Sequence, residues 1–404
     1  MLQISSRAKE MPASAIRRLV PLSEAAEAAG VNVYHLNVGA PDIKSPDCAV
    51  ETFVERSREL HHVSYTHSAG LKELRQEMAE KYYRKIGLDV SPEQILITVG
   101  GSEAFAVAMQ IAAAPGEEII VVEPFYTNYQ TYAFLNGITL KAVHSDIHDA
   151  FKVPDISEFE RILTPATRAV LLSNPCNPSG KLFTKEEMLE IGEFCRRHDL
   201  FLICDEVYRE FCYTDEPFFS ALELPGCERN VILVDSVSKR YNLCGTRIGC
   251  IVSRNPEVMA CALKYAQARL CPPLLGQYAA IGALDTPMSY FREVRDEYIR
   301  RRDYVLEALN AMPGVFAPVP YGAFYTVAEL PVDDAGQFAK WLLTDFRLDN
   351  ETLMITPAES FYKTPGAGRT HARIAYVLEV PRLIKAMNIL AEALKKYNSD
   401  VRRD

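Results

Sequence analysis

The sequence lacks several features that mark secreted or membrane proteins. It contains no stretch approaching the roughly 18 uninterrupted apolar residues that a membrane-spanning helix needs. Its first residues, MLQISSRAKEMPAS, include no continuous apolar segment, so we expect no signal peptide. None of its ten cysteines forms a C-x-x-C pair, which disfavours a zinc site or a disulfide framework. Several lie in apolar runs, and we interpret them as reduced structural thiols of a cytoplasmic protein.

Clustered positive charge is also missing. Lys and Arg number 44 against 53 Asp and Glu, which gives a formal net charge of −9. Nucleic-acid backbones and anionic membrane surfaces both require basic patches, so neither is an expected partner. A small anionic ligand stays compatible with this charge, because a single pocket can be locally positive.

The 404 residues predict two or three domains, and a hydrophobic fraction of 48% is ordinary for a globular chain. Short runs rich in Val, Ile and Leu alternate with longer helix-like segments. The runs expected to be strands are 94–100, 117–124, 138–145, 168–175, 200–208, 230–239 and 248–254. They show little polar alternation, which is typical of strands buried on both faces of a mostly parallel sheet. The alternation with helices predicts an α/β fold with a doubly wound sheet.

Helical patterns separate these runs and also close the chain. Residues 184–199 open with Thr184 and carry Glu187 three residues later, which is the spacing of a capping box. A long charged amphipathic helix is expected near 286–304, where the composition shifts. The predicted domains are a large one, 46–290, and a smaller α+β one built from both termini, 1–45 and 291–404.

Polar side chains follow the run NVILVDSVSKRYNLCGTRIG at the point where its strand is expected to end. Ser236, Ser238 and Lys239 come first, and Arg247 follows eight residues after the lysine. Ligands of doubly wound sheets bind beyond the carboxyl ends of the strands. Two hydroxyls, an amine and a guanidinium suit a phosphorylated carbonyl ligand, because a lysine amine forms a Schiff base with a carbonyl. A solvated loop is the alternative interpretation of this segment alone.

Two neighbouring strands end in further polar groups. Asp205 closes the apolar run LFLICDEVY, where a carboxylate is unfavourable unless it is paired, and Tyr208 follows three residues later. A buried carboxylate is the partner that a pyridinium nitrogen needs, although a helix-capping role is the alternative. Asn177 lies in the rigid turn NPCNPSG and is a candidate contact to a cofactor oxygen.

Two more segments carry candidate anion ligands. Gly100, Gly101 and Ser102 follow the first strand and open a helix, so their N–H groups can approach an anion. The sequence there is not G-x-G-x-x-G, and a dinucleotide site is therefore unsupported. Arg373 lies in the strand-like run HARIAYVLE, and arginine is suited to bidentate capture of a carboxylate, with an exposed strand arginine as the alternative.

Taken together and in this order, the segments resemble the class I/II aminotransferases, which are fold-type I enzymes that use pyridoxal 5'-phosphate (PLP). The resemblance runs from LNVGAPD (36–42) to RIAYVLE (373–379), and its most specific parts are NPCNPSG, DEVY and SVSK followed by R-x-G. Within the family the chain is similar to prokaryotic aspartate aminotransferases. The resemblance implies PLP as the cofactor, no metal, and an amino acid and a 2-oxo acid as the small-molecule partners.

The resemblance also implies roles for the residues around the cofactor ring. Lys239 would form the Schiff base and then move the proton between the substrate α-carbon and the cofactor carbonyl carbon. Asp205 would pair with the ring nitrogen, and Tyr208 and Asn177 would hydrogen-bond the ring 3-oxygen. Tyr126, in EPFYTNY, would stack on the ring.

Further roles follow for the phosphate and the substrate. The residues implied to hold the phosphate are Gly101, Ser102, Ser236 and Arg247. Tyr65, in YTHSAG, is similar to a tyrosine that reaches the phosphate of the neighbouring subunit, which implies a homodimer with shared active sites. Arg373 would bind the substrate α-carboxylate, with Asn177 beside it, and Gly39 in NVGAPD would lie over the site.

The implied activity is transamination, with aspartate as the leading donor, aromatic or broad specificity next, and 2-oxoglutarate as the acceptor. The chain departs from the aspartate enzymes in two places: Ser102 stands where some have Lys, and the partner-subunit arginine before an N-P-P turn is unmatched in YAQARLCPP. Arg17, Arg18 and Arg269 are candidate replacements. A C–S β-lyase on the same scaffold is the alternative reaction. A PLP-binding regulator is disfavoured, because only about 45 residues precede the sheet domain and the chain is acidic.

Overall fold

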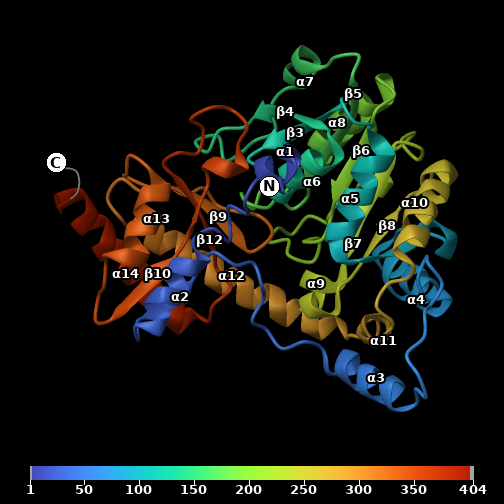
Figure 1. The fold of residues 1–404 in the computed structure, drawn as a ribbon, viewed down its shortest axis with the longest axis horizontal. Coiled ribbons are helices and arrows are strands. Elements are labelled where there is room, and N and C mark those ends of the chain that lie inside the picture. The colour runs from blue at the N-terminus through green and yellow to red at the C-terminus, as the bar shows by residue number, and fades with distance from the viewer. Residues whose placement is uncertain (1, 401–404) are drawn as a thin grey trace.

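The computed structural model describes residues 2–400 and is built around a seven-stranded sheet (Figure 1). The strand order is β2-β8-β7-β6-β5-β3-β4. All pairs are parallel except the two that β8 makes with β2 and β7. In chain order the strands are β2 (Ile95–Val99), β3 (Glu118–Glu123), β4 (Thr139–His144), β5 (Thr167–Ser173), β6 (Phe201–Asp205), β7 (Val231–Ser236) and β8 (Ile248–Val252). Each overlaps one of the seven predicted runs, so the mostly parallel sheet is confirmed.

Helices cover both faces of this sheet. Along β6, Leu202 and Cys204 join the core on one face, and Ile203 joins the core on the other. Alternate side chains of a strand point to opposite faces, so a strand covered on both sides buries every residue. The helices on the Ile203 side are α5 (Gly100–Ala112), α6 (Asn128–Asn136) and α10 (Pro256–Arg269). Those on the other side are α3 (Asp47–Arg58), α4 (Lys72–Glu77), α7 (Ile156–Ile162), α8 (Lys185–Arg197) and α11 (Leu274–Ala283).

Helix α8 begins where the capping box predicts. The Thr184 hydroxyl accepts a hydrogen bond from the Glu187 N–H at 3.1 Å, and the Glu187 carboxylate accepts one from the Thr184 N–H at 2.8 Å. Both bonds satisfy N–H groups that have no partner within the helix. Met188, Ile191 and Cys195 then recur on one face and are fully buried against the sheet.

A second core lies beside the sheet and draws on both ends of the chain. Strand β1 (Asn32–His35) pairs in parallel with β10 (Glu351–Met354), so the N-terminal part folds with the C-terminal part. A three-stranded antiparallel sheet is formed by β11 (Thr356–Pro357), β12 (His371–Ala375) and β9 (Tyr325–Glu329). The helices of this core are α2 (Val20–Ala28), α12 (Met288–Asn310), α13 (Ala335–Thr344) and α14 (Val380–Asp400). This shared core supports the division that we propose, 46–290 against 1–45 with 291–404.

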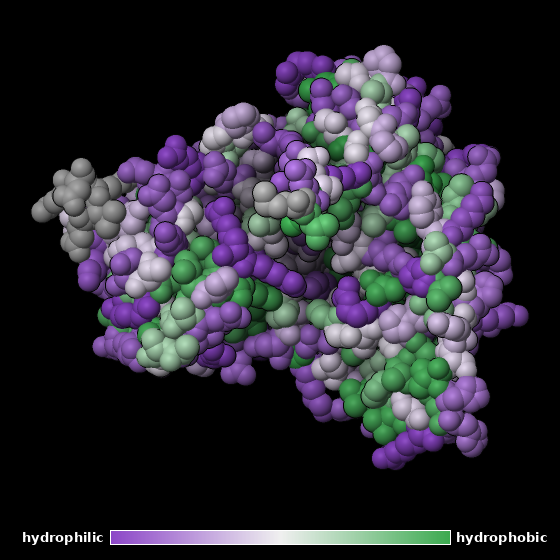
Figure 2. Space-filling view, in the orientation of Figure 1, coloured by the Kyte–Doolittle hydropathy of each residue, from purple (hydrophilic) through white to green (hydrophobic). Residues whose placement is uncertain are grey.

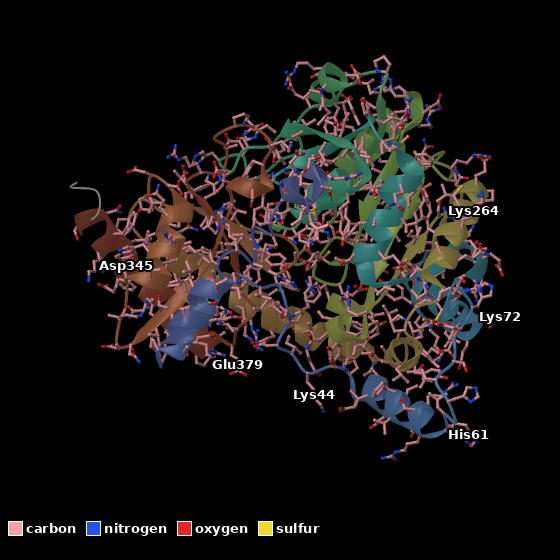
Figure 3. The ribbon with its side chains drawn as sticks, in the orientation of Figure 1. Lys44, His61, Lys72, Lys264, Asp345 and Glu379 are labelled. Atoms are coloured by element: carbon pink, nitrogen blue, oxygen red, sulfur yellow. The ribbon has the colours of Figure 1, made fainter. Side chains whose placement is uncertain are left out.

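The remaining elements are short. They are α1 (Ser6–Glu10), α9 (Val237–Arg240), a π-helical turn (Met78–Tyr83) and 3-10 turns at Arg84–Ile86, Pro92–Gln94, Ala221–Glu223, Cys244–Thr246 and Glu359–Phe361. Charged side chains at the periphery, such as Lys72, Lys264 and Glu379, are exposed (Figure 3). Within residues 2–400, no helix combines the length and the apolar character required to cross a membrane.

Candidate active site

The residues predicted to carry chemistry gather at one edge of the large sheet. Strands β5, β6 and β7 are parallel neighbours, so their carboxyl ends meet. Ser173 at the end of β5 pairs in register with Asp205 at the end of β6. Ser236 ends β7, and helix α9 with Lys239 starts directly after it. The fold therefore brings three of the predicted polar segments to the place where doubly wound sheets bind their ligands.

Lys239 reaches from the large sheet to the N-terminal part of the chain. Its Nζ donates a hydrogen bond to the carbonyl oxygen of Gly39 at 2.8 Å, and the sulfur of Cys244 lies 3.8 Å away. Helix α9 is fixed at its start by Ser236, whose hydroxyl accepts from the Ser238 N–H at 3.1 Å. The lysine amine is thus held on a capped helical turn beside Gly39, which was itself predicted to lie over the site.

Asp205 is a buried carboxylate, with an exposed fraction of 3%. Its Oδ2 accepts a hydrogen bond from the Tyr129 hydroxyl at 2.7 Å, and its Oδ1 accepts one from the Val207 N–H at 3.2 Å. Burial raises the pKa of Asp205 to about 7 and outweighs these two hydrogen bonds, which lower it. A positively charged group beside the carboxylate would reverse this shift and restore the ionised form.

A cradle for an anion lies at the amino terminus of α5. The guanidinium of Arg247 packs against Gly100, where any Cβ would overlap it, and donates to the Cys244 carbonyl oxygen at 3.0 Å. Gly100 has a φ of +70°, a conformation that glycine adopts without strain. Gly101 and Ser102 follow in the first turn and are half-buried. The free N–H groups of a helix start and an arginine together favour a phosphate.

Arg373 belongs to β12 of the smaller sheet and is 1% exposed. Its Nη1 donates to the Asn177 Oδ1 at 3.0 Å, and its Nη2 donates to the Asn37 carbonyl oxygen. Its Nε and both polar atoms of the Asn37 side chain are buried without a hydrogen-bond partner. Among residues 2–400 no carboxylate pairs with this guanidinium. A buried charge without a counter-charge is unfavourable, so the group fits the capture of a substrate carboxylate.

Three tyrosines complete the cluster. Tyr126 is half-buried, and its hydroxyl accepts from the Asn128 amide at 2.9 Å. The hydroxyl of Tyr208 lies 3.0 Å from that of Tyr325, which belongs to β9 of the smaller sheet. Burial raises the pKa of Tyr208 well above its usual value, so the phenol keeps its proton and can act as a donor.

The sequence did not point to Tyr129 or Tyr325. Tyr129 stands three residues after Tyr126, at the start of α6, so the helical spacing was a usable signal. Tyr325 lies in the aromatic run GAFYTVAEL, which has the character of a core strand and gave no such signal. Tyr65 was predicted for the site but is 80% exposed on the loop between α3 and α4. Its predicted role depends on a second subunit.

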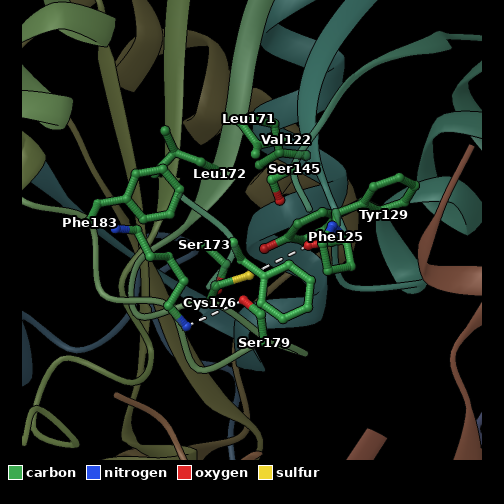
Figure 4. A pocket seen from close by; sticks show the side chains of 13 residues that line it. Val122, Phe125, Tyr129, Ser145, Leu171, Leu172, Ser173, Cys176, Ser179 and Phe183 are labelled. Carbon is green, nitrogen blue, oxygen red and sulfur yellow. Dashed lines mark hydrogen bonds between the residues drawn. The ribbon is translucent and has the colours of Figure 1, made fainter. Parts of the chain in front are cut away.

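A small cavity lies where the ends of β3 and β5 meet the turn that follows β5, and Tyr129 contributes to its lining (Figure 4). Its volume is about 20 Å³, and its lining includes Ser173, Cys176 and Ser179. A space of this size accommodates a single water molecule and is too small for a cofactor. A larger hollow of about 760 Å³ lies between α12 and α14 and contains none of the predicted residues.

Comparison with known proteins identifies the family. Residues 31–387 match the model of "Aminotransferase class I and II". The chain belongs to the class I and II aminotransferase family. A putative aminotransferase, YugH, of Bacillus subtilis is 31% identical over 97% of this chain and 98% of its own. The aromatic-amino-acid aminotransferase 2 of Thermococcus litoralis is 29% identical over 98% and 99%. The structure of an aspartate aminotransferase from Thermotoga maritima superposes with a TM-score of 0.88 at 28% identity, covering 97% and 100%.

The protein is therefore an aminotransferase of fold type I, and its cofactor is PLP. The residues present fit that cofactor. Asp205 offers a buried carboxylate whose ionised form needs a cationic neighbour, and Arg247 with the start of α5 offers a phosphate cradle. The Lys239 amine donates to the carbonyl oxygen of Gly39 and offers the group for the covalent link to the cofactor. Within the described residues, no three His, Cys, Asp or Glu side chains are grouped to hold a metal ion.

Proposed function

We propose that this aminotransferase moves an amino group from an L-amino acid to 2-oxoglutarate, with aspartate as the leading donor and aromatic amino acids next. The observation that carries this proposal is Arg373. Its buried guanidinium is held by Asn177 and the Asn37 carbonyl, close in sequence to Gly39, and it pairs with no carboxylate in the described part of the chain. An amino acid and a 2-oxo acid share the carboxylate that such a group binds.

We assign the proton transfer to Lys239. PLP, when bound, withdraws electron density from the substrate α-carbon, so that its proton becomes removable. The Lys239 amine takes that proton and returns it, and its place on the capped turn of α9 keeps it within the site. Arg373 fixes the substrate carboxylate, which orients the bond to be broken. Asn177 accepts from Arg373 through Oδ1 and keeps its amide N–H groups for the cofactor 3-oxygen.

The remaining side chains would hold the cofactor. Asp205 places its negative charge at the ring nitrogen, Tyr208 donates to the 3-oxygen, and the Tyr126 ring packs on the cofactor ring. The phosphate would be bound by Gly101, Ser102, Ser236 and Arg247 at the start of α5 and the end of β7. A bound phosphate at this place gains both hydrogen bonds and the favourable end of the helix dipole.

Three arginines are the candidates for binding the side chain of the amino donor. Arg269 is bonded to Glu103 at 2.9 Å, so its charge is already compensated within the chain. Arg17 and Arg18 are exposed on the segment before α2 and remain candidates for binding a second carboxylate. Alanine variants of all three should show which one lowers kcat/KM for aspartate, and three unaffected variants would refute a role for these arginines in binding the second carboxylate.

We also propose a homodimer with shared active sites and a cytoplasmic location. Figure 2 shows hydrophobic atoms gathered over the region of α3 and α11, at the lower right. Exposed apolar side chains there include Val50 on α3, with Val63 and Tyr65 on the loop that follows it. An exposed apolar patch of this kind favours contact with a second copy. All ten cysteines are free thiols, as the location requires.

A panel of amino acids and 2-oxo acids tests the proposed reaction. With an amino acid and no 2-oxo acid, a transaminase completes one half-reaction per site and stops. Continuous release of pyruvate and ammonia would instead identify the β-lyase. Turnover that starts only when 2-oxoglutarate is added is the expected result, and turnover with other 2-oxo acids alone would overturn the assigned acceptor.

A further inference from the structure

Tyr325 touches the groups assigned to cofactor and substrate but has no role of its own in the site described above. It opens β9 of the smaller sheet and is 2% exposed. Its hydroxyl lies 3.0 Å from the hydroxyl of Tyr208, and the two rings meet edge to face at 5.7 Å. Tyr208 comes from the loop after β6, so this contact joins the two sheets at the site.

The same ring lies beneath Arg373. The guanidinium carbon of Arg373 is 4.5 Å from the centroid of the Tyr325 ring, a distance typical of a cation–π contact. Arg373 and Tyr325 belong to neighbouring strands, β12 and β9, of the smaller sheet. The ring therefore supports the guanidinium from one side, while Asn177 binds it through Nη1 at 3.0 Å.

The hydroxyl of Tyr325 also explains the glycine at position 39. A Cβ on Gly39 would overlap the Tyr325 hydroxyl, so only glycine fits there. The carbonyl oxygen of Gly39 is the one that accepts from Lys239 at 2.8 Å. Tyr325 thus contacts the backbone that lies over the lysine, the tyrosine next to the cofactor, and the arginine for the substrate.

We propose that Tyr325 is a positioning residue with two separable functions, and this rests on the proposed function of the site. Its hydroxyl donates a hydrogen bond to the Tyr208 oxygen, which directs the single proton of Tyr208 to the cofactor 3-oxygen. Hydrogen bonds in such a chain strengthen one another, so Tyr208 becomes a better donor. Its ring holds the plane of Arg373 in the orientation that binds the α-carboxylate.

The two functions are tested with two substitutions. Tyr325→Phe removes the hydroxyl and keeps the ring, whereas Tyr325→Leu removes both. A weaker donor at the 3-oxygen destabilises the deprotonated form of the link between the cofactor and Lys239. For Tyr325→Phe we therefore expect the pH midpoint of the visible absorbance of the bound cofactor to rise by roughly half a unit, and its dissociation constant to increase about threefold. KM for the amino acid should stay at the wild-type value, because Arg373 keeps its support.

For Tyr325→Leu we expect the same rise in the absorbance midpoint and the same increase in the cofactor dissociation constant. In addition, KM for the amino acid should increase about tenfold, because the ring that supports Arg373 is lost. Tyr376→Phe is the matched control, because it removes another buried hydroxyl of the same core, which donates to the Ala323 carbonyl oxygen at 3.3 Å. This control should leave the absorbance midpoint, the cofactor dissociation constant and KM unchanged.

A Tyr325→Phe holoenzyme with the wild-type absorbance midpoint and the wild-type cofactor dissociation constant would overturn the proposal. An equal rise in KM for Tyr325→Phe and Tyr325→Leu would overturn the separation of the two functions. Both resting-state measurements need cofactor but no substrate. A wild-type enzyme that binds the cofactor yet fails to transaminate would therefore refute the proposed function and leave this test intact.

Discussion

Asp205 shows most clearly how a single residue is prepared for a cofactor. The fold keeps its carboxylate away from water, and among residues 2–400 the carboxylate accepts two hydrogen bonds and forms no ion pair. This arrangement is unfavourable for the chain alone, because burial stabilises the neutral acid over the carboxylate. In the site that we propose, the cationic ring nitrogen of the cofactor would compensate for it, so the stability of the folded chain and the binding of the cofactor would be linked through this one group.

That linkage predicts how the stability of the cofactor-free protein depends on pH. The pKa of Asp205 is raised to about 7, whereas an exposed aspartate titrates near about 3.9. Between these values the folded chain binds a proton that the unfolded chain has released. The contribution of Asp205 to stability therefore falls as pH rises through this window, by about 4 kcal/mol in all, and stays constant above it. Asp205→Asn should remove this contribution.

Urea unfolding of the two cofactor-free proteins at several pH values measures the effect. Asp47→Asn, at an exposed position on α3, is the matched control and should retain the wild-type slope. Saturating cofactor should flatten the wild-type curve as well. Identical slopes for wild type and Asp205→Asn would contradict the raised pKa.

For single residues of the site, the sequence is informative where a polar residue interrupts or ends an apolar run. Lys239, Asp205 and Arg373 were predicted for that reason, and the structure brings their segments to one site. The sequence does not assign Tyr325 to the site, because an aromatic residue in GAFYTVAEL is equally suited to a hydrophobic core. Its contact with Tyr208 depends on the docking of two sheets, which local patterns do not specify.

Among the elements, helix α9 is short and needs outside support. It spans only Val237–Arg240, yet it carries the lysine. Arg240 follows that lysine, is 2% exposed, and bonds both oxygens of Asp235 at 2.8 Å. Its Nε lies 2.9 Å from Glu210, and its guanidinium carbon is 3.6 Å from the ring centroid of Tyr82. These buried contacts anchor α9 to β7 and fix the direction from which Lys239 enters the site.

Breaking the contact between Asp235 and Arg240 should lower the stability of the folded chain. Asp235→Asn removes the carboxylate that binds Arg240 through two hydrogen bonds and leaves the partly buried Glu210 to compensate its charge, so we expect a loss of about 3 kcal/mol in the free energy of unfolding. Arg229→Ala is the matched control, because it removes an ion pair with Glu257 that is mostly exposed and should change stability by less than about 1 kcal/mol. Urea unfolding measures both, and equal losses would show that the buried pair does not anchor α9.

Long apolar runs predicted the elements of the large sheet well, because covering both faces leaves no place for polar residues. The elements of the second core were harder to assign. Strand β1 pairs with β10, which lies more than three hundred residues later, and no local pattern specifies such a partner. The two-residue strand β11 and the π-helical turn Met78–Tyr83 arise from tertiary packing and leave no periodic signal.

For the molecule as a whole, the proposed dimer explains the exposed position of Tyr65, which a single chain does not explain. Tyr65 is 80% exposed, although the family resemblance places it at a phosphate. If each site combines Lys239 from one subunit with Tyr65 from the other, a mixed dimer of two inactive variants regains one complete site. Tyr65→Ala and Lys239→Ala proteins, unfolded and refolded together in equal amounts, should recover about a quarter of the wild-type activity.

Each variant refolded alone is the control and should remain inactive or severely impaired. Sedimentation of the wild-type enzyme should give the mass of two 45.3 kDa chains. Ile384→Asp, which alters an exposed residue in the hollow between α12 and α14, should not change that mass. A mixture without recovered activity would contradict shared active sites, and a wild-type monomer would contradict the dimer.

The central claim is that Lys239 binds the cofactor. The most direct test is to reduce the cofactor-loaded enzyme with borohydride, digest it, and identify by mass spectrometry the peptide that carries the cofactor. The account predicts one modified residue, Lys239, and no covalent cofactor in the Lys239→Ala protein. A cofactor attached to another lysine, or retained covalently by Lys239→Ala with continued turnover, would contradict it.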